Sequence, residues 1–513
     1  MSLSLTRCCF LAIFASLCGV HAFPGPSQYS DVDWAISQAD GHSNSIPFNN
    51  AQFTCKVLEI ALGNGSNNSV VEPSDSSYDS LEDINYSATC RLPAACIISP
   101  TSTAQVSLAI KIITKLRTKF AVRSGGHKDT PGFAGVDGTG VLISLSELNS
   151  IALAKDRSTL TVGPGCRWQA VYDTVVPQGL IVVGGRVGIV GVAGFLLGSG
   201  VSYYTNHYGL AFDNIKRFEV VLGDGRVVNA SASQNPDLFK GLHGGATNFG
   251  IVTSFELNTY PFGDIYYEAR VYDTNHTAAF LEAFAEYQFT GQLDPLSSVT
   301  VQVPSTGPVV LLQYAKPVAS TSSFDAFKNL PYTTYIPPTN GTLLELLSFA
   351  AAGFPTGDIR TYGETFSHKV DAAFMVQAYG IFKAEIANLP AGAQAIWVPT
   401  ALPAKAANDN NLLGLSKIPQ QWHEWFITWT DASQDAQIYA ISKTITAKLV
   451  AAAKAKNVLL PYLFMNTAGT SQHVLESFGA SNVQVIKNVA AKHDPGQVFQ
   501  KYQNDGYLLR KLQ

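Results

Sequence analysis

Glycine is concentrated in three short stretches of this chain, at residues 123–127, 184–200 and 244–252. The second stretch holds seven glycines in seventeen positions, and the first follows directly on the apolar run Phe120-Ala121-Val122. Glycine allows tight turns, and it also lets backbone N–H groups come close to an anionic group. Each stretch taken alone fits a set of tight turns equally well. Together they favour a fold with a loop-lined site for a phosphate-bearing ligand, for which a pyrophosphate is a suitable group.

The residues around the first two stretches alternate between helical and extended patterns. After Pro100-Thr101-Ser102, apolar residues recur at helical spacing from Val106 to Leu116. Gly223-Asp224-Gly225 suits a hairpin turn between two short strands. The predicted strands are 120–122, 141–145, 160–162, 180–183, 218–222, 226–228 and 249–257. This mixture predicts an α+β domain that ends near residue 262.

A second domain is expected from Gly263 onward, because amphipathic helices replace most of the glycine loops. The length of 513 residues is also well above the size at which one core usually divides. The predicted helices are 278–287, 436–453 and 482–492, and the predicted strands include 299–303, 309–314 and 459–465. Residues 23–52 are polar and contain Pro and Gly, which predicts an irregular arm.

Composition and motifs exclude several classes of protein. Hydrophobic residues make up 46% of the chain and charged residues 14%, which is unlike a disordered protein. The formal net charge of -4 and the lack of long Lys/Arg runs argue against nucleic acid as a partner. An orthodox dinucleotide-binding unit, a P-loop, a G-x-S-x-G elbow and HExxH are all missing from the sequence. The cysteine spacing fits no metal site.

The first 22 residues have the features of a secretory signal. Arg7 precedes an apolar core, Cys8 to Val20, that is too short to span a bilayer, and Val20-His21-Ala22 forms a cleavage site. The alternative is a buried N-terminal helix. Removal of residues 1–22 changes the net charge from -4 to -5, since one Arg and no acid is lost. No later stretch is long and apolar enough for a membrane span, so a secreted protein without membrane association is expected.

Cysteines and sequons agree with export. Four cysteines remain after residue 22, namely Cys55, Cys90, Cys96 and Cys166, and in an oxidising compartment they allow three full pairings. Six Asn-x-Ser/Thr sequons are candidate glycosylation sites, at Asn64, Asn67, Asn85, Asn229, Asn275 and Asn340.

A series of motifs runs in a fixed order along the chain. The motifs are RSGGH (123–127), PGF and VDGTGVLISLSELN (131–149), TVGPGCRWQAVY (161–172), GVAGFLLGSG (191–200), YGLAFDNI (208–215), VVLGDGRVVNAS (220–231), NPDLFKGLHGG (235–245) and TNFGIVTSFEL (247–257). The tail adds YLFMN (462–466), HDP (493–495) and DGYLL (505–509). This order resembles the FAD domain of the vanillyl-alcohol oxidase superfamily and, within it, the secreted fungal berberine-bridge-enzyme-like oxidases.

The resemblance implies a two-domain PCMH-type FAD-binding fold. The implied parts are a signal peptide (1–22), an arm and the start of the FAD domain (23–92), the PCMH-type FAD-binding domain (93–262), a substrate-binding domain with an antiparallel sheet backed by helices (263–455), and a C-terminal segment that returns to the FAD domain (456–513).

The resemblance also implies particular roles for residues. His127 matches the histidine that bonds covalently to the 8α-methyl carbon of the flavin, a reaction that needs a neutral imidazole. The alternative is a loop histidine that only donates or accepts hydrogen bonds. The residues implied to surround the pyrophosphate and ring are Arg123, Ser124, Gly125, Gly126, Gly191, Val192, Gly194, Gly198, Gly200, Gly250, Ile251, Val252 and Asn466. The implied disulfide is Cys55–Cys96, while Cys90 and Cys166 form either a second bridge or buried thiols.

The chain departs from the family pattern in its second flavin link. Many relatives have a cysteine at the position of Val187, and valine cannot form a thioether, so a single covalent link to FAD is predicted. Val190 lies where the family controls oxygen access, and valine there is compatible with O2 as acceptor.

A further departure concerns the catalytic base. The loop tyrosine of plant relatives corresponds to Val201, and no substrate-domain glutamate stands in a recognisable context near 396–399. Tyr203 and Tyr462 are candidates for polarising a substrate hydroxyl, although core tyrosines are commoner than catalytic ones.

The implied activity is oxidation of an alcohol or similar C–H/O–H group of a small molecule. Hydride passes to the flavin, and O2 then takes up the electrons to give H2O2. A fungal secondary metabolite is the favoured substrate class, with carbohydrate as the alternative, because the missing cysteine argues against the bicovalent sugar oxidases. A competing hypothesis is a flavin-fold binding protein or cyclase with little redox turnover.

Overall fold

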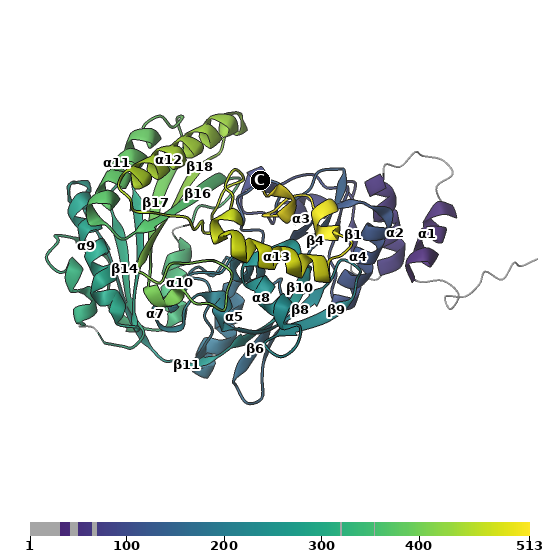
Figure 1. The fold of residues 1–513 in the computed structure, drawn as a ribbon, viewed down its shortest axis with the longest axis horizontal. Helices are drawn as coiled ribbons and strands as arrows, with labels where there is room; N and C mark the ends of the chain where they lie inside the picture. The colour runs from purple at the N-terminus through teal and green to yellow at the C-terminus, as the bar shows by residue number, and fades with distance from the viewer. Residues whose placement is uncertain (1–30, 42–49, 64–68, 319–320, 353) are drawn as a thin grey trace, which may run out of the picture.

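The computed structural model describes residues 31–41, 50–63, 69–318, 321–352 and 354–513. The signal at 1–22 and the sequons at Asn64 and Asn67 lie outside these residues. Figure 1 shows two bodies side by side, one built around several small sheets and the other around a single large sheet. No helix in the described ranges is long and apolar enough to cross a membrane.

The first body contains a four-stranded sheet in the order β1-β2-β4-β3, in which β2, β4 and β3 run parallel. Its strands are β1 (Val70–Val71), β2 (Cys96–Ile98), β3 (Lys119–Arg123) and β4 (Gly140–Ser144). Helices α2 (Asn50–Leu62) and α4 (Thr103–Leu116) contact each other, and their apolar residues share a core with this sheet. The Ser102 side chain caps α4 by accepting a hydrogen bond from the Gln105 backbone N–H. The chain leaves α4 for β3, which leads straight into the first glycine stretch.

A second sheet of the first body is antiparallel, in the order β5-β6-β10-β8-β9. Its strands are β5 (Ile151–Leu153), β6 (Thr159–Val162), β8 (Ile215–Val221), β9 (Val227–Ser231) and β10 (Ile251–Asn258). Beside it lie the pair β7 (Leu180–Ile181) and β11 (Tyr260–Pro261) and the helices α5 (Trp168–Val175), α6 (Val192–Leu197), α7 (Thr205–Tyr208) and α8 (Pro236–Gly245). These elements fall near the predicted positions, so the α+β prediction is confirmed.

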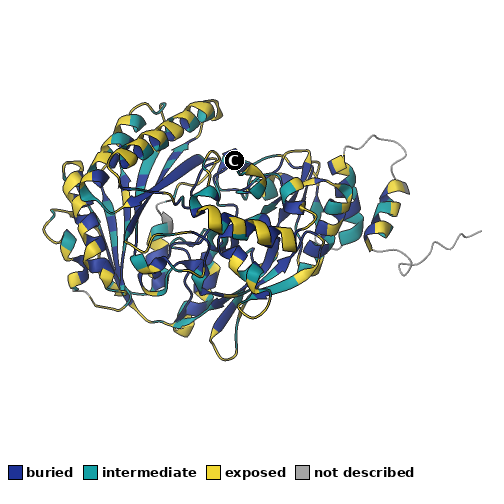
Figure 2. Cartoon of the chain, viewed as in Figure 1, coloured by how far each residue is buried: buried dark blue, intermediate teal, exposed yellow. Residues whose placement is uncertain are grey.

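The second body is an eight-stranded antiparallel sheet in the order β15-β12-β14-β13-β17-β18-β16-β19. Its strands are β12 (Ile265–Val271), β13 (Ser297–Pro304), β14 (Val309–Tyr314), β15 (Thr333–Gly341), β16 (Arg360–Lys369), β17 (Gln394–Leu402), β18 (Gln420–Trp429) and β19 (Leu459–Leu460). Helices α9 (Thr277–Phe289), α11 (Ala372–Ile386) and α12 (Asp435–Ala455) cover its outer face, and Figure 2 shows the strands buried beneath them.

The two faces of this sheet belong to different cores. Trp397, His423 and Trp425 lie on the helix-covered face, whereas Trp422 shares a core with the first body. Because side chains alternate along a strand, Glu424 lies on the same face as Trp422 and points toward the first body. On the helix-covered face the Nε2 atoms of His368 and His423 are 2.7 Å apart, in a fully buried pair.

The C-terminal segment returns to the first body. Helix α13 (Ala480–His493) packs on α8, where Lys492 and His493 contact the Asp237 carboxylate at 2.7 and 3.0 Å. Beyond α14 (Val498–Lys501), Gln503 forms a bridge to Phe120 of β3. Figure 1 shows α13 lying across the first body, close to α8.

Two predicted elements were wrong. Residues 23–52 are not all irregular, since α1 (Asp31–Gly41) packs on the start of α2 through the buried Ala35 and Ala39. The strand predicted at 459–465 ends at Leu460, because β19 pairs only with Ser367 and His368 at the sheet edge. The following residues leave the sheet and cross to the first body. The remaining helices are α3 (Tyr78–Glu82) and α10 (Leu343–Ala352).

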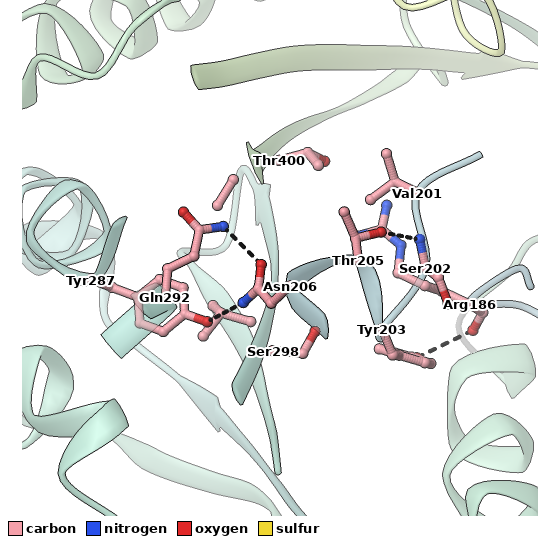
Figure 3. Close-up of a pocket in the computed structure, with 12 residues that line it drawn as sticks. Arg186, Val201, Ser202, Tyr203, Thr205, Asn206, Tyr287, Gln292, Ser298 and Thr400 are labelled. Atoms are coloured by element: carbon pink, nitrogen blue, oxygen red, sulfur yellow. Dashed lines mark hydrogen bonds between the residues drawn. The ribbon is translucent and has the colours of Figure 1, made fainter. Parts of the chain in front are cut away.

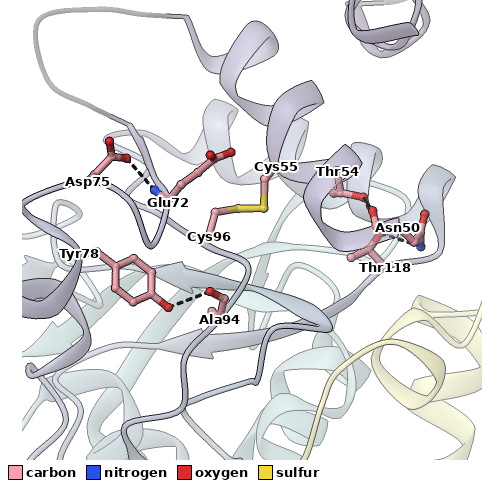
Figure 4. Close-up of a disulfide and its surroundings, with 9 residues drawn as sticks. All are labelled: Asn50, Thr54, Cys55, Glu72, Asp75, Tyr78, Ala94, Cys96 and Thr118. Atoms are coloured by element: carbon pink, nitrogen blue, oxygen red, sulfur yellow. Dashed lines mark hydrogen bonds between the residues drawn. A yellow bond between two sulfur atoms is a disulfide. The ribbon is translucent and has the colours of Figure 1, made fainter. Parts of the chain in front are cut away.

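The structure contains the predicted Cys55–Cys96 disulfide, which joins α2 to β2 (Figure 4). Cys90 and Cys166 are separate buried thiols, which settles the alternative left open by the sequence. Burial raises the pKa of the Cys90 thiol to about 12 and that of Cys166 to about 11. Both thiols are therefore protonated at neutral pH.

One sequon is incompatible with the fold. Asn85 is 1% exposed, and its amide nitrogen donates to the Cys90 carbonyl at 2.9 Å. A glycan on that nitrogen would remove this bond and has no room, so the glycosylation prediction at Asn85 was wrong. Asn229 is half-buried, whereas Asn275 and Asn340 are exposed and stay candidate sites.

Candidate active site

The first two glycine stretches meet backbone to backbone. A Cβ added to Gly125 would lie 2.5 Å from the Cα of Gly191, and one added to Gly191 would lie 2.7 Å from the Cα of Gly125. Real Cβ atoms do not approach other atoms so closely, so glycine is required on both sides. Gly126 adds a left-handed turn at φ +67°, and the Ser124 hydroxyl donates to the Pro164 carbonyl. The loops at 123–127 and 184–200 therefore form one continuous surface.

His127 lies at the end of the first loop with a partly buried ring. The ring stacks on Tyr86 with centroids 4.6 Å apart, and Phe354 lies edge-on at 6.2 Å. The Nε2 atom is buried and has no hydrogen-bond partner among the described residues. Burial, followed by the Arg167 charge, lowers the pKa of His127 to about 4. The imidazole is thus neutral at physiological pH, the form that can act as a nucleophile.

Asn466 holds the second loop in place. Its amide nitrogen donates to the carbonyls of Gly194 and Phe195 at 3.0 and 3.2 Å, and its oxygen accepts from the Gly200 N–H at 3.2 Å. Gly198 packs directly against this side chain. Gly194 in α6 is exposed, and an added Cβ would meet no protein atom within 4 Å. The loop is therefore rigidly held but leaves an open face at Gly194.

The other predicted cofactor residues have structural contacts of their own. Arg123 is fully buried, and its guanidinium donates to the Glu82 carbonyl and the Ser144 hydroxyl at 3.4 Å. Val187, Val190 and Val192 lie in or beside the second loop, and Val192 opens α6. Ile251 and Val252 are buried at the start of β10, and an added Cβ on Gly250 would lie 2.7 Å from the Val221 carbonyl oxygen.

Glu424 is a buried carboxylate that the sequence analysis missed. It lies on β18, is 6% exposed, and faces the first body. Thr400 donates to its Oε1 at 3.3 Å, and Thr467 donates to its Oε2. Burial raises the pKa of Glu424, although the Thr467 bond and the Arg186 charge act in the opposite direction. A buried carboxylate with a raised pKa suits general base chemistry. The signal in the sequence was a single acid inside the apolar run 422–429.

Lys128 connects the histidine loop to Glu424. Its ammonium donates to the carbonyls of Asn466 and Ala468 at 3.3 and 2.8 Å, so it grips both neighbours of Thr467. Asp129 lies 3.4 Å from the ammonium and balances its charge. Lys128, the residue next to His127, thus positions Thr467, whose hydroxyl donates to the Glu424 carboxylate.

Tyr203 and Tyr462 are both near this site but are not suited to act as bases. Tyr203 is 4% exposed, and its hydroxyl donates to the Arg186 carbonyl at 3.2 Å. Burial raises the pKa of Tyr203 to about 12 and also raises that of Tyr462. The Tyr462 ring packs on that of Trp422, with centroids 4.5 Å apart. Both phenols stay protonated, so they can donate a hydrogen bond but not accept a proton.

Known proteins are similar to this chain in sequence and fold. A model described as an FAD binding domain matches residues 94–231. The FAD-dependent monooxygenase macF of Penicillium terrestre is 39% identical over 477 residues, covering 91% of each chain. The chain belongs to the same family of FAD-dependent oxidoreductases as this relative.

Solved structures of carbohydrate oxidases have the same fold. A chitooligosaccharide oxidase has a TM-score of 0.73 at 22% identity, covering 93% of this chain and 100% of that one. The glucooligosaccharide oxidase of Acremonium strictum, whose FAD carries 6-S-cysteinyl and 8α-N1-histidyl links, has a TM-score of 0.72 at 19% identity, covering 85% and 97%. The PCMH-type fold predicted from the sequence is confirmed.

The residues present fit FAD. The two interlocked glycine loops lack side chains at Gly125, Gly126 and Gly191, which lets a pyrophosphate approach their backbone closely. The unpartnered Nε2 of His127 and the open face at Gly194 are features that a bound flavin would use. FAD-binding oxidoreductase is therefore the class of this protein, in agreement with the named relatives.

Proposed function

We propose that this protein is a secreted oxidase that removes hydrogen from an alcohol or similar C–H/O–H group of a small organic molecule. The observation that carries the proposal is the chain of contacts from His127 through Lys128 and Thr467 to Glu424. These contacts place a neutral, nucleophilic imidazole and a buried carboxylate base at one junction between the two bodies.

Each group has a separate task in the proposed reaction. Glu424 accepts the proton of the substrate hydroxyl, since its raised pKa makes it a stronger base than an exposed carboxylate. Tyr462 donates a hydrogen bond to the substrate oxygen, since the Tyr203 hydroxyl already donates to the Arg186 carbonyl. FAD, when bound, supplies the hydride acceptor and passes the two electrons to O2, which gives H2O2.

The flavin link is proposed to be single and to run through His127. The pKa of about 4 leaves the His127 imidazole unprotonated, so a ring nitrogen would be able to hold FAD covalently. Val187, at the position of the second link, has no nucleophilic atom. In this respect the chain differs from the glucooligosaccharide oxidase named above, which has a cysteinyl link.

A fungal secondary metabolite is the proposed substrate class, since the 39% identical relative is an FAD-dependent monooxygenase of a fungus. The name of that relative also raises the question of where oxygen goes. An oxidase releases both oxygen atoms as H2O2, whereas a monooxygenase inserts one atom into its product. Val190, compatible with oxygen access, supports the oxidase.

Secretion is supported by the Cys55–Cys96 disulfide, because such bonds persist in oxidising compartments. The exposed sequons at Asn275 and Asn340 agree with this route.

The decisive experiment is peptide mapping of the denatured protein for flavin, in the wild type and His127→Ala. We expect FAD mass on the peptide containing His127 alone, and no peptide-bound flavin in the variant. Flavin released freely by the wild type would remove the covalent link. A protein that lacks flavin altogether would favour a binding protein or cyclase.

Glu424→Gln tests the base in the same holoprotein. We expect flavin content to stay at the wild-type level while the rate of flavin bleaching by substrate falls about 100-fold or more. Turnover in 18O-labelled O2 separates an oxidase from a monooxygenase. Label found in H2O2 but not in the organic product supports the oxidase. Label in the organic product would show a monooxygenase.

A further inference from the structure

A polar pocket opens beside the candidate base, between the second glycine loop and the large sheet. Its cavity volume is about 20 Å³, room for about one water molecule, within a wider hollow of about 310 Å³ that includes open solvent. Arg186, Ser202 and Thr205 line one side, and Asn206, Gln292 and Tyr287 line the other, with Thr400 above them in the view of Figure 3. Thr400 also donates to Glu424, so the pocket reaches the base through one side chain.

Arg186 is the charged residue of this pocket. Its guanidinium is half-buried and has no ion-pair partner in the part of the chain that the structure describes. The other lining side chains are neutral hydroxyl, amide, phenol and apolar groups. A positive charge taken partly out of water is costly unless an anion balances it.

Two further polar atoms in the lining have no partner among the described residues. The Ser202 hydroxyl is buried, with the residue 4% exposed, and it lies next to Arg186 in Figure 3. The Gln292 amide oxygen is also buried without a hydrogen bond, although its nitrogen donates to Asn206 at 3.1 Å. Buried polar atoms are normally satisfied, so these two, together with the unpaired guanidinium, indicate a polar ligand that the protein is built to receive.

We propose that this pocket binds a carboxylate of the substrate, held by the guanidinium of Arg186 and the hydroxyl of Ser202. A planar guanidinium matches a carboxylate in two parallel hydrogen bonds, and a hydroxyl supplies a third donor. The Gln292 oxygen is an acceptor and suits a hydroxyl or N–H group on the same ligand. The substrate class is therefore a small organic acid that also carries the hydroxyl to be oxidised.

The carboxylate site at Arg186 does not depend on the proposed function. Oxidation of a hydroxyl on the same ligand does rest on the proposed function. The carboxylate at Arg186 would fix one end of the molecule, and Thr400, which lines the pocket and donates to Glu424, lies between that end and the base. The charge of Arg186 also lowers the pKa of Glu424, which shows that the two groups are within electrostatic range. A neutral sugar would leave the guanidinium without a carboxylate in direct contact, since Glu424 acts on it only at longer range, so the pocket favours an acid over a carbohydrate.

The test measures binding of benzoate, with benzamide as the uncharged molecule of the same shape. Purified holoprotein is titrated with each, and both the shift in thermal midpoint and the flavin absorbance are recorded. We expect benzoate to bind at least tenfold more tightly than benzamide. Arg186→Met should remove that preference, because loss of a charge-assisted hydrogen bond costs about a factor of ten or more. Ser202→Ala should weaken benzoate binding to a smaller extent.

The matched control is Arg226→Met, since Arg226 lies on the surface hairpin and its side chain is 62% exposed. It should bind benzoate as the wild type does. Equal affinity for benzoate and benzamide, or benzoate binding that Arg186→Met leaves unchanged, overturns the inference. If Arg186→Met instead changes the resting flavin spectrum with benzoate affinity intact, the guanidinium serves the flavin ring. The thermal shift needs no flavin, so failure of the proposed function would appear separately, as missing flavin or missing H2O2.

Discussion

Replacing Gly125 by alanine should force apart the two loops that are proposed to hold FAD. The new Cβ would lie 2.5 Å from the Cα of Gly191 and 2.9 Å from its N. Carbon atoms normally stay about 3.5–4.0 Å apart, so the backbones must separate by about 1 Å. Neither neighbour is the end of a flexible side chain, and no rotamer change can relieve the contact.

We expect this overpacking to cost about 2–3 kcal/mol of unfolding free energy, the upper part of the range for inserted methyl groups. At about 2–4 °C per kcal/mol, the value for a domain of about 150–250 residues, that corresponds to about 4–12 °C in the thermal midpoint. A displacement of about 1 Å at a reacting group can cost about 100-fold in rate, so covalent flavin incorporation should fall strongly as well.

The assay is the ratio of protein-bound flavin to protein, together with the thermal midpoint, for the wild type and Gly125→Ala. Gly380→Ala is the matched control, because Gly380 lies exposed in α11 and its added Cβ would meet nothing within 4 Å. There the same substitution should stabilise the helix by about 0.5–1 kcal/mol. Wild-type flavin content and midpoint in Gly125→Ala would refute the idea that the loops are in rigid contact.

Three further predictions concern the disulfide, the histidine pair and Lys128. Replacing both Cys55 and Cys96 by alanine should lower the unfolding free energy by about 4 kcal/mol, from the 41-residue separation of the bonded positions, as measured by denaturant titration. Burial lowers the pKa of His368 to about 4 and that of His423 well below its usual value, so the unfolded chain binds more protons below about pH 6.5. The unfolding free energy should therefore fall as the pH drops from about 6.5 toward 4, by about 3 kcal/mol from His368 alone. A variant with Phe in place of both His368 and His423 should lose this pH dependence. If that variant keeps the wild-type dependence of unfolding free energy on pH, the reasoning is contradicted. Lys128→Met should lower kcat and shift the pH profile of the candidate base while flavin stays bound, with partial rescue by Lys128→Arg; an unchanged profile would assign Lys128 a purely structural role.

Local patterns in the sequence were enough for much of the fold. Helical spacing from Val106 to Leu116 and the short apolar runs near the glycine loops predicted α4, β3 and β4 close to their observed positions. These patterns record which face of each element is buried, and that property depends on neighbours a few positions away. The strand at 459–465 failed because pairing at the sheet edge involves only two residues, which no local pattern reports.

The sequence by itself determined where the glycine loops and the candidate flavin histidine lie, since turns and close backbone approach depend on residue type. Only the tertiary structure decided which side chains meet there. Lys128 reaches the Ala468 carbonyl across 340 positions of the chain, and Glu424 becomes a candidate base only because β18 turns it toward the first body. The low pKa of His127, the buried state of Asn85 and the unpaired charge of Arg186 likewise come from packing. Burial and charge proximity are properties of assembled elements, and they act through distances that a linear pattern does not contain.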